Sequence, residues 1–333
     1  MAVRQMPDDL SLFVWFVTWQ IYRFAVLLKG RYPSYSIALC NLVVKWNAES
    51  PSVLKQRLHA RALLTTGLLR SEQGDREGSV AINSSIVNGH RRSEDREIRT
   101  HVAWAMANSG LDLTELGRAE QAIEVFEQLI TLIPPEDPYL QPLAQGLNNW
   151  ASALGDLGRH DESIAIDDRI ATILAEREDE PNLGYLYAWA LVAKGETLAF
   201  QRDFAGAINV FDDVLHKWWS SQVRGPSDRL QEALAAALRH RSASLVALHE
   251  YNSAIADVNR VIDRFAGSRT VGIQEEVAWA MLGKAIALEQ IGRRAEALST
   301  CDLVVKQYGH STNAQVSQPL SLARKFRQTL IGA

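Results

Sequence analysis

Apolar residues recur at steps of three and four along most of the chain, a pattern that predicts amphipathic helices rather than strands. The pattern itself repeats along the sequence. The block VAWAMANSGLDLTELGRAEQAI at 102–123 recurs as VAWAMLGKAIALEQIGRRAEAL at 277–298, and YAWALVAKGETLAFQRDFAGAI at 187–208 is a third copy. Weaker copies occupy 146–164 and 234–255. This self-similarity predicts an array of equivalent structural units.

Seven copies align on a small residue near the end of each block, with spacings between 41 and 47 residues. These small residues are Ser36, Ser79, Ala122, Ser163, Ala207, Ala254 and Ala297. Twelve residues earlier, six copies have a second small residue, and Phe24 is the exception. A small residue on each of two consecutive helices lets their backbones approach closely. Each copy is therefore predicted to be a hairpin of two helices, A and then B.

Glycine and proline positions agree with this division. Gly117, Gly158 and Gly292 follow the A helix, where glycine accepts a positive φ. All ten prolines avoid the interiors of the predicted repeat helices, where a proline would cost about 3 kcal/mol. They are Pro7, Pro33, Pro51, Pro134, Pro135, Pro138, Pro142, Pro181, Pro226 and Pro319.

These observations predict one all-α, right-handed α-solenoid that occupies residues 1–333 as a single domain. Its seven hairpins start near residues 17, 60, 103, 144, 188, 235 and 278. A final capping helix is expected at about 313–331, beginning near Pro319, with Arg324, Arg327 and Gln328 on one polar face. The first repeat is the least regular, as is typical of terminal repeats.

The repeat resembles the tetratricopeptide repeat, a helical hairpin of about 34 residues. The matching residues in one copy are Gly110, Leu113, Gly117, Ala122, Phe126 and Pro134. The resemblance covers about residues 17–311. The period near 43 is longer, and it is similar to the long-period variants of kinesin light chains and bacterial signalling proteins. The resemblance implies a scaffold that binds a peptide, a helix or a protein.

The composition does not indicate which class of partner the chain binds. The net charge of −4 over 333 residues provides no overall attraction to nucleic acid. Two distant cysteines, Cys40 and Cys301, exclude a disulfide scaffold and suit a reducing compartment. We therefore expect a cytoplasmic protein that does not bind nucleic acid, and the resemblance to bacterial signalling proteins implies a bacterial source.

The apolar stretch at 10–28 is about long enough to span a bilayer. Gln20 and Arg23 lie near its middle, where polar and charged groups are unfavourable in lipid. The stretch is therefore predicted to be a packed helix rather than a membrane span. A scaffold anchored to a membrane through these residues remains an alternative.

The sequence shows none of the catalytic motifs searched for. There is no phosphate-binding loop, no HExxH, and no metal-ligand spacing among the eight histidines. Cys40 and Cys301 fall at a core position of helix B, so we expect buried thiols rather than nucleophiles. The pairs Asp167-Asp168 and Asp212-Asp213 are expected on solvated faces. These features predict a protein without catalytic activity, cofactor or metal.

The concave groove that the resemblance implies is lined by A helices, and tryptophan recurs at the second A-helix position. These tryptophans could pack between adjacent A helices, line the groove or lie on ordinary surface. Asn108 and Asn149 stand at the position where the family bonds a peptide backbone. Arg61 and Arg241 could also pair with ligand carboxylates. The groove candidates are Trp104, Asn108, Asn148, Asn149, Ser152, Trp189, Glu196, Arg239, His240 and Trp279.

A second candidate surface lies near the N-terminus, where one helix has too many aromatic rings to bury against a single neighbour. It consists of Phe13, Trp15, Phe16, Trp19 and Tyr22. Some of these rings are expected to meet a protein partner, a second copy of the chain or a membrane surface. A simple core role is the alternative.

The sequence therefore predicts a binding scaffold, more specifically a sensor or regulatory subunit of a bacterial effector complex. A receptor for a small signalling peptide and a membrane-associated scaffold are the alternatives from other classes.

Overall fold

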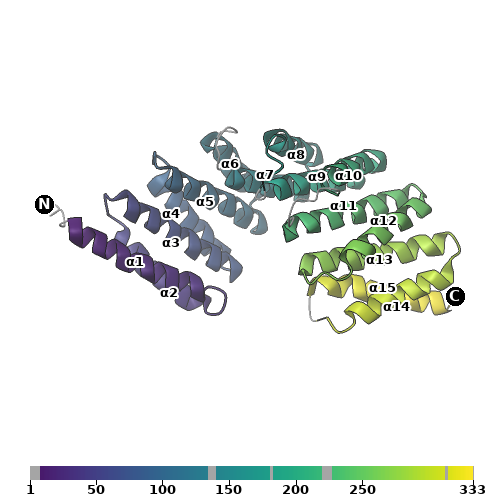
Figure 1. Ribbon diagram of the computed structural model, residues 1–333. Helices are drawn as coiled ribbons and strands as arrows, with labels where there is room; N and C mark the ends of the chain where they lie inside the picture. The colour runs from purple at the N-terminus through teal and green to yellow at the C-terminus, as the bar shows by residue number, and fades with distance from the viewer. Residues whose placement is uncertain (1–7, 134–139, 181–182, 220–226, 312–313, 333) are drawn as a thin grey trace. The chain divides into compact units, whose positions relative to one another are not determined.

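The computed structural model describes residues 8–133, 140–180, 183–219, 227–311 and 314–332, with side chains from residue 12 onward. Within these residues the secondary structure consists of fifteen α-helices and no strands (Figure 1). The chain divides into two compact units, Met1–Arg159 and His160–Ala333. The fourth predicted repeat lies across this division, because its A helix belongs to the first unit and its B helix to the second.

The first unit contains α1 to α7. Its A helices are α1 Asp8–Leu28, α3 Val53–Glu72, α5 Arg96–Glu115 and α7 Gln141–Asp156. Its B helices are α2 Pro33–Asn47, α4 Arg76–His90 and α6 Ala119–Leu132. Each B helix packs against its own A helix and against the next one, and successive A helices also touch each other. This is the arrangement of an α-solenoid.

The second unit repeats the arrangement. Its B-layer helices are α8 His160–Leu174, α10 Phe204–Trp218, α12 Tyr251–Phe265 and α14 Arg294–Tyr308. Its A-layer helices are α9 Gly184–Phe200, α11 Asp228–Ala247, α13 Val271–Gln290 and α15 Ala314–Gly332. The final helix α15 contacts both α13 and α14, so it occupies the place of a further A helix.

The long repeat period is explained mainly by the A helices. Helices α3, α5, α11 and α13 have 20 residues each, whereas most B helices have 15. All four begin seven residues before the repeat starts predicted at 60, 103, 235 and 278. The additional residues therefore extend the A helix at its N-terminal end by about two turns.

Two of the small A-helix positions face large B-helix side chains. A Cβ atom added to Gly110 would lie 2.3 Å from the ring of Phe126, and one added to Gly195 would lie 2.5 Å from the ring of Phe211. Both rings are fully buried. Cys40 and Cys301 stand at the same B-helix position, and both thiols are buried with a pKa raised by burial to about 11. The prediction of inert core cysteines is confirmed.

The turn after the A helix has the left-handed backbone that glycine accepts. Gly74, Gly117, Gly158 and Gly292 have φ between 71° and 84°. Arg202 and His249 adopt positive φ at the same repeat position, with values of 68° and 63°. Pro33 and Pro142 lie in the first turns of α2 and α7, where proline fits. The prolines at 7, 134, 135, 138, 181 and 226 lie outside the described residues.

The predicted register of the first hairpin is wrong by one residue. The hydroxyl of Ser36 on α2 donates to the carbonyl of Ala25 on α1 at 2.8 Å. In a later repeat, Ser242 and Ala254 make the corresponding A-to-B contact at 3.1 Å. Ala25 is fully buried, whereas Phe24 is 56% exposed. Ala25 is therefore the small A-helix residue, because the first turn is one residue shorter than the others.

The C-terminal helix also differs from its prediction in its starting point. It begins at Ala314, so Pro319 lies inside the helix, in its second turn, instead of marking the start. Pro319 is buried. Arg324 and Gln328 are exposed on the outer side of α15, as expected of a polar capping face.

Candidate protein-binding surface

Three successive A helices of the second unit are joined by a row of charged contacts. Glu196 on α9 lies 2.5 Å from Nε2 of His240 on α11. The neighbouring Arg239 contacts His240 and forms an ion pair with Glu276 on α13. The row therefore crosses α9, α11 and α13 and orients Arg239 toward α13.

A hollow of about 240 Å³ lies between α11 and α13, beside this row. Arg239 and Trp279 both line it. The remaining lining is mostly apolar and consists of Ser242, Ala243, Val246, Ala280, Leu282, Gly283 and Ile286. An apolar recess with a guanidinium at its edge can hold an apolar side chain and also hydrogen-bond a backbone carbonyl.

Burial and neighbouring charges shift the pKa values of the carboxyl groups around this recess. Burial opposes ionisation of Glu196, but the hydrogen bond and charge of His240 outweigh burial and lower the Glu196 pKa. Burial and the adjacent Glu276 raise the pKa of Glu275. The same two causes raise the pKa of Glu232. On its α13 side, the charge of Arg239 therefore faces two carboxyl groups, those of Glu275 and Glu276.

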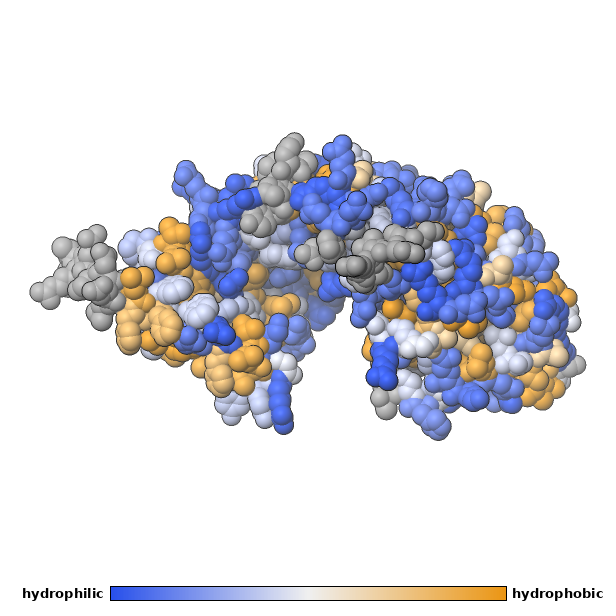
Figure 2. Space-filling model, in the orientation of Figure 1, coloured by the Kyte–Doolittle hydropathy of each residue, from blue (hydrophilic) through white to orange (hydrophobic). Residues whose placement is uncertain are grey.

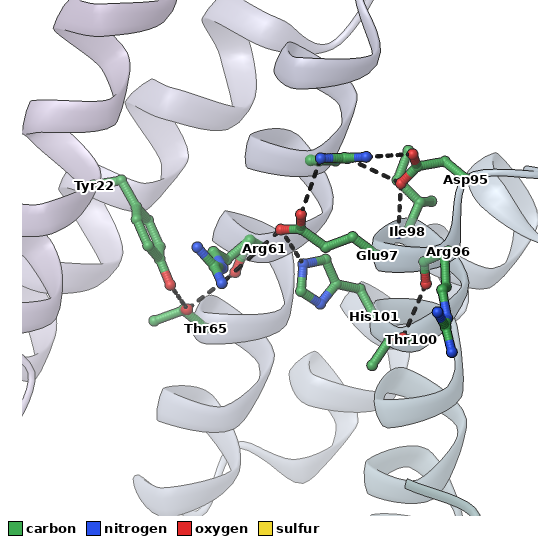
Figure 3. Close-up of polar contacts among 10 residues, drawn as sticks. Tyr22, Arg61, Thr65, Asp95, Arg96, Glu97, Ile98, Thr100 and His101 are labelled. Atoms are coloured by element: carbon green, nitrogen blue, oxygen red, sulfur yellow. Dashed lines mark hydrogen bonds and ion pairs between the residues drawn. The ribbon is translucent and has the colours of Figure 1, made fainter. Parts of the chain in front are cut away.

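The first unit has a second polar network on its A helices (Figure 3). Arg57 on α3 donates to both carboxylate oxygens of Asp95, at 3.0 and 2.7 Å, and lies 3.4 Å from Glu97. Asp95 also caps α5, because it accepts from the backbone N–H of Ile98 at 3.1 Å. The hydrogen bonds from Arg57 hold the pKa of Asp95 below its usual value.

Glu97 joins this network to two further groups. It lies 3.9 Å from the guanidinium of Arg61 and 3.6 Å from Nε2 of His101. Burial, followed by the nearby positive charge of Arg61, lowers the pKa of His101. Tyr22 reaches the network from α1 through a 3.1 Å contact with Thr65 (Figure 3). Arg61 is half exposed, so its guanidinium can also reach a ligand.

The predicted groove residues fall on five A helices, α5, α7, α9, α11 and α13. Trp104 and Asn108 lie on α5, and the α7 residues are Asn148, Asn149 and Ser152. Trp189 and Glu196 lie on α9. The second unit brings together Glu196, Arg239, His240 and Trp279. The three tryptophans are all partly exposed. Their role in binding stays a prediction.

The predicted N-terminal aromatic surface separates into two sets. Trp15, Trp19 and Tyr22 are partly buried and pack on a cluster that includes Ala25 and Cys40. Phe13 and Phe16 are 63% and 49% exposed, and Phe24 belongs with them. The corrected register also places Trp19 at the A-helix position of Trp104, Trp189 and Trp279.

Two features escaped the sequence reasoning. Arg57, Asp95 and Glu97 lie on, or just before, the N-terminal extensions of the A helices, which the 34-residue repeat pattern does not contain. The expectation of a solvated Asp167 is wrong, because this residue is fully buried. Asp167 stands at the B-helix core position of Phe126 and Phe211, a register signal that was present in the sequence.

Burial raises the pKa of Asp167 to about 8, and the neighbouring Asp168 contributes to the rise. Neither carboxylate oxygen of Asp167 has a hydrogen-bond partner among the described residues. Asp168, Asp212 and Asp213 are exposed, as expected.

Among the described residues, no group of three or more His, Cys, Asp or Glu side chains is arranged to hold a metal ion. No described helix combines the length and apolarity that a membrane span requires.

Repeated A/B hairpins that share their cores with both neighbours define the helical-repeat class of proteins. The profile of the family described as Tetratricopeptide repeat matches residues 105–136, which cover most of α5 and all of α6. Residues 105–136 are therefore a tetratricopeptide repeat, and the other hairpins of the chain repeat its architecture. No curated protein matches the sequence.

Solved structures support the fold. Pseudomonas aeruginosa PilF is similar with 15% identity and a TM-score of 0.51, over 82% of this chain and 99% of that chain. The TPR2AB domain of yeast Sti1, in complex with pHSP90, has 18% identity and a TM-score of 0.33, over 92% and 98%. A Parabacteroides merdae tetratricopeptide repeat protein has 13% identity and a TM-score of 0.37, over 80% and 98%. Because these identities are low, the comparisons support the fold alone. The likeness to PilF, with its TM-score of 0.51, is the one that carries this support.

Proposed function

We propose that the chain is a protein-interaction scaffold that binds a peptide segment of its partner on the A helices of the second unit. One observation carries the proposal: Arg239 and Trp279 line the same largely apolar hollow between α11 and α13. Half-exposed tryptophan and arginine are the side chains that most often anchor protein interfaces.

The size and chemistry of the hollow define what it accepts. Its 240 Å³ is less than the roughly 300–1,000 Å³ of pockets that hold whole small molecules. One apolar side chain of a peptide fits this volume better than a cofactor does. Arg239 is already paired with Glu276, so it offers its remaining N–H groups to a backbone carbonyl rather than demanding an acidic ligand.

The test is selection of binders from a random-sequence peptide library on the purified chain, followed by affinity measurement on variants. Trp279→Ala is expected to weaken selected peptides about thirtyfold, which corresponds to about 2 kcal/mol. Ala243→Leu fills the hollow from an exposed position and is expected to weaken binding without removing core packing. Trp46→Ala is the matched control, because Trp46 is 48% exposed on α2.

Equal binding by wild type, Trp279→Ala and Ala243→Leu, with all three folded, contradicts the proposal. The tryptophans would then be spacers between A helices, as the sequence reasoning allowed. Melting temperatures measured alongside identify any variant that has lost stability instead of an anchor.

A finer proposal is that the partner belongs to a bacterial effector complex in the cytoplasm, in which this chain is a regulatory or sensor subunit without catalytic activity. The support is the resemblance of the long repeats to bacterial signalling proteins. Affinity capture from the native host followed by mass spectrometry tests it. Recovery of a free short peptide instead of an effector favours the signalling-peptide receptor.

A further inference from the structure

Helix α1 exposes a stripe that is covered in the A helices that follow it. The stripe consists of Phe13, Phe16, Gln20, Phe24 and Leu27, spaced by three and four residues. The corrected register aligns it with Leu230, Ala233, Ala237, Arg241 and Ser244 of α11. Of these α11 residues, four are buried and Arg241 is largely so, whereas Phe13, Phe16, Phe24 and Leu27 are 63%, 49%, 56% and 80% exposed.

In later repeats, the residues equivalent to this stripe pack against the preceding hairpin. On α7, a Cβ atom added to Gly146 would meet Leu129 of α6 at 2.3 Å. The Trp150 ring on α7 stacks on the Phe126 ring of α6, with the ring centroids 6.1 Å apart. Arg241 on α11 lies 2.7 Å from Asp212 of α10. Helix α1 therefore presents a docking face for a hairpin that the described chain does not contain.

The two ends of the repeat array differ in chemistry. The outer side of α15 has exposed polar residues, including Arg324, Lys325 and Gln328. The stripe on α1 has three phenylalanines and a leucine, and hydrophobic surface gathers over the α1 and α2 end of the first unit (Figure 2). A solvated cap has no need of these rings, so the stripe fits a face that becomes covered.

We propose that a second copy of this chain covers the stripe, with the two α1 helices antiparallel about a two-fold axis at Gln20. The spacing of the stripe is symmetric about this residue. Antiparallel packing places Phe16 against Phe24 of the second copy and Phe13 against Leu27 of the second copy. The two Gln20 amides meet at the axis, where each can donate to the other and accept from it.

The charges along the sequence favour the same orientation. Helix α1 begins with Asp8 and Asp9, and Lys29 and Arg31 follow its C-terminal end. In an antiparallel pair, the acidic N-terminal end of α1 lies beside the basic residues that follow α1 in the second copy, so segments of opposite charge are neighbours at both ends. A parallel arrangement brings like charges together. The stripe is therefore self-complementary only in the antiparallel pair.

The length of the stripe determines the affinity that we expect for the dimer. From Phe13 to Leu27 it covers 15 residues, with a rise of about 21 Å along the helix. One helix face of this length gives an interface at the small end of the range for specific complexes. We therefore expect a dimer that dissociates in roughly the micromolar range and re-forms on concentration.

Sedimentation velocity of the full chain between about 1 and 100 µM tests the proposal without any peptide ligand, so it is independent of the proposed function. The mass is expected to rise from one chain to two. Phe16→Asp is expected to weaken dimerisation at least tenfold. Phe200→Asp is the matched control, because Phe200 is 73% exposed on α9, and it should leave the mass unchanged. A monomer at 100 µM overturns the proposal.

Disulfide trapping tests the orientation. Gln20→Cys should give a cross-linked dimer under mild oxidation, because the antiparallel register brings its two copies together. Phe13→Cys should not, because its counterpart is Leu27; native Cys40 and Cys301 are buried and do not interfere. Equal cross-linking of both variants overturns the antiparallel register. Co-sedimentation of a monomeric chain with anionic phospholipid vesicles, lost in Phe16→Asp, overturns the second copy in favour of a membrane surface.

Discussion

The guanidinium of Arg327 on α15 donates to the carboxylate of Asp302 on α14 at 2.5 Å. The same two repeat positions meet in three earlier pairs of helices of the second unit. Those contacts are Lys194 with Asp168 at 2.5 Å, Arg241 with Asp212 at 2.7 Å, and Lys284 with Asn259 at 2.6 Å. The recurrence shows that α15 stands in register as the A helix of an eighth repeat whose B helix is absent from the described chain.

Of these four contacts, the one made by Arg241 is expected to contribute most to the free energy of unfolding. Arg241 also pairs with Asp257 at 2.5 Å, and that carboxylate is only 4% exposed. Arg241→Met leaves Asp257 buried without its main partner and is expected to destabilise the protein by about 3 kcal/mol. Urea denaturation followed by far-UV circular dichroism measures the change.

Arg327→Met is the matched control, because it makes the same change at the same repeat position. Asp302 is half exposed, so this variant is expected to lose about 1 kcal/mol or less. Hydrogen exchange in Arg241→Met should rise first in α10 to α12, since each repeat contacts only its neighbours. A uniform rise along the chain contradicts the repeat-by-repeat account.

Replacement by alanine is expected to change the free energy of unfolding in opposite directions at two glycines. Gly195→Ala places a methyl group 2.5 Å from the Phe211 ring and should destabilise by about 1–3 kcal/mol. A Cβ atom at Gly283, inside α13, meets nothing within 4 Å. Gly283→Ala should therefore stabilise by about 0.5–1 kcal/mol, because alanine favours the helix. Melting temperatures that fall equally in both variants refute this difference in packing.

Asp167 is expected to make stability fall as pH rises. Burial raises its pKa to about 8 in the folded chain, from an ordinary value of 3.8. Between these values the folded chain retains a proton that the unfolded chain releases. Stability should therefore decrease from about pH 4 to pH 8, by at most about 1.4 kcal/mol per pH unit.

The comparison of native protein with Asp167→Asn isolates this effect. Burial lowers the pKa of His59 to about 4, so His59 acts in the opposite sense, with stability lost as pH falls below 6.5. Both proteins share the His59 contribution, and their difference does not contain it. Chemical denaturation at pH 5, 6.5 and 8 should show the variant gaining on the native chain as pH rises. Parallel curves for the two proteins mean that Asp167 is ionised in the fold.

The repeating elements were predictable because each is determined by local pattern. Small residues such as Gly110 must face large ones such as Phe126, so the hairpins follow from the spacing alone. Turn glycines and core cysteines follow from the same register. That the chain forms one domain stays a prediction.

The departures arise where local pattern stops being informative. The first hairpin has a shorter turn, so alignment on Ser36 placed Phe24 where Ala25 stands. The buried Asp167 breaks the apolar rule at its position, and its charge made a solvated face the simpler interpretation. The network of Arg57, Asp95 and Glu97 depends on the length of the A helices, which the family pattern does not contain.

The polar outer side of α15 decides what kind of assembly the chain can form. If both ends of the repeat array were apolar, one molecule's last helix could receive the next molecule's first, and such head-to-tail contacts propagate into open filaments. Exposed Arg324 and Gln328 disfavour such growth at this end. In the proposed pairing, association through the N-terminal stripe therefore closes at two molecules instead of propagating.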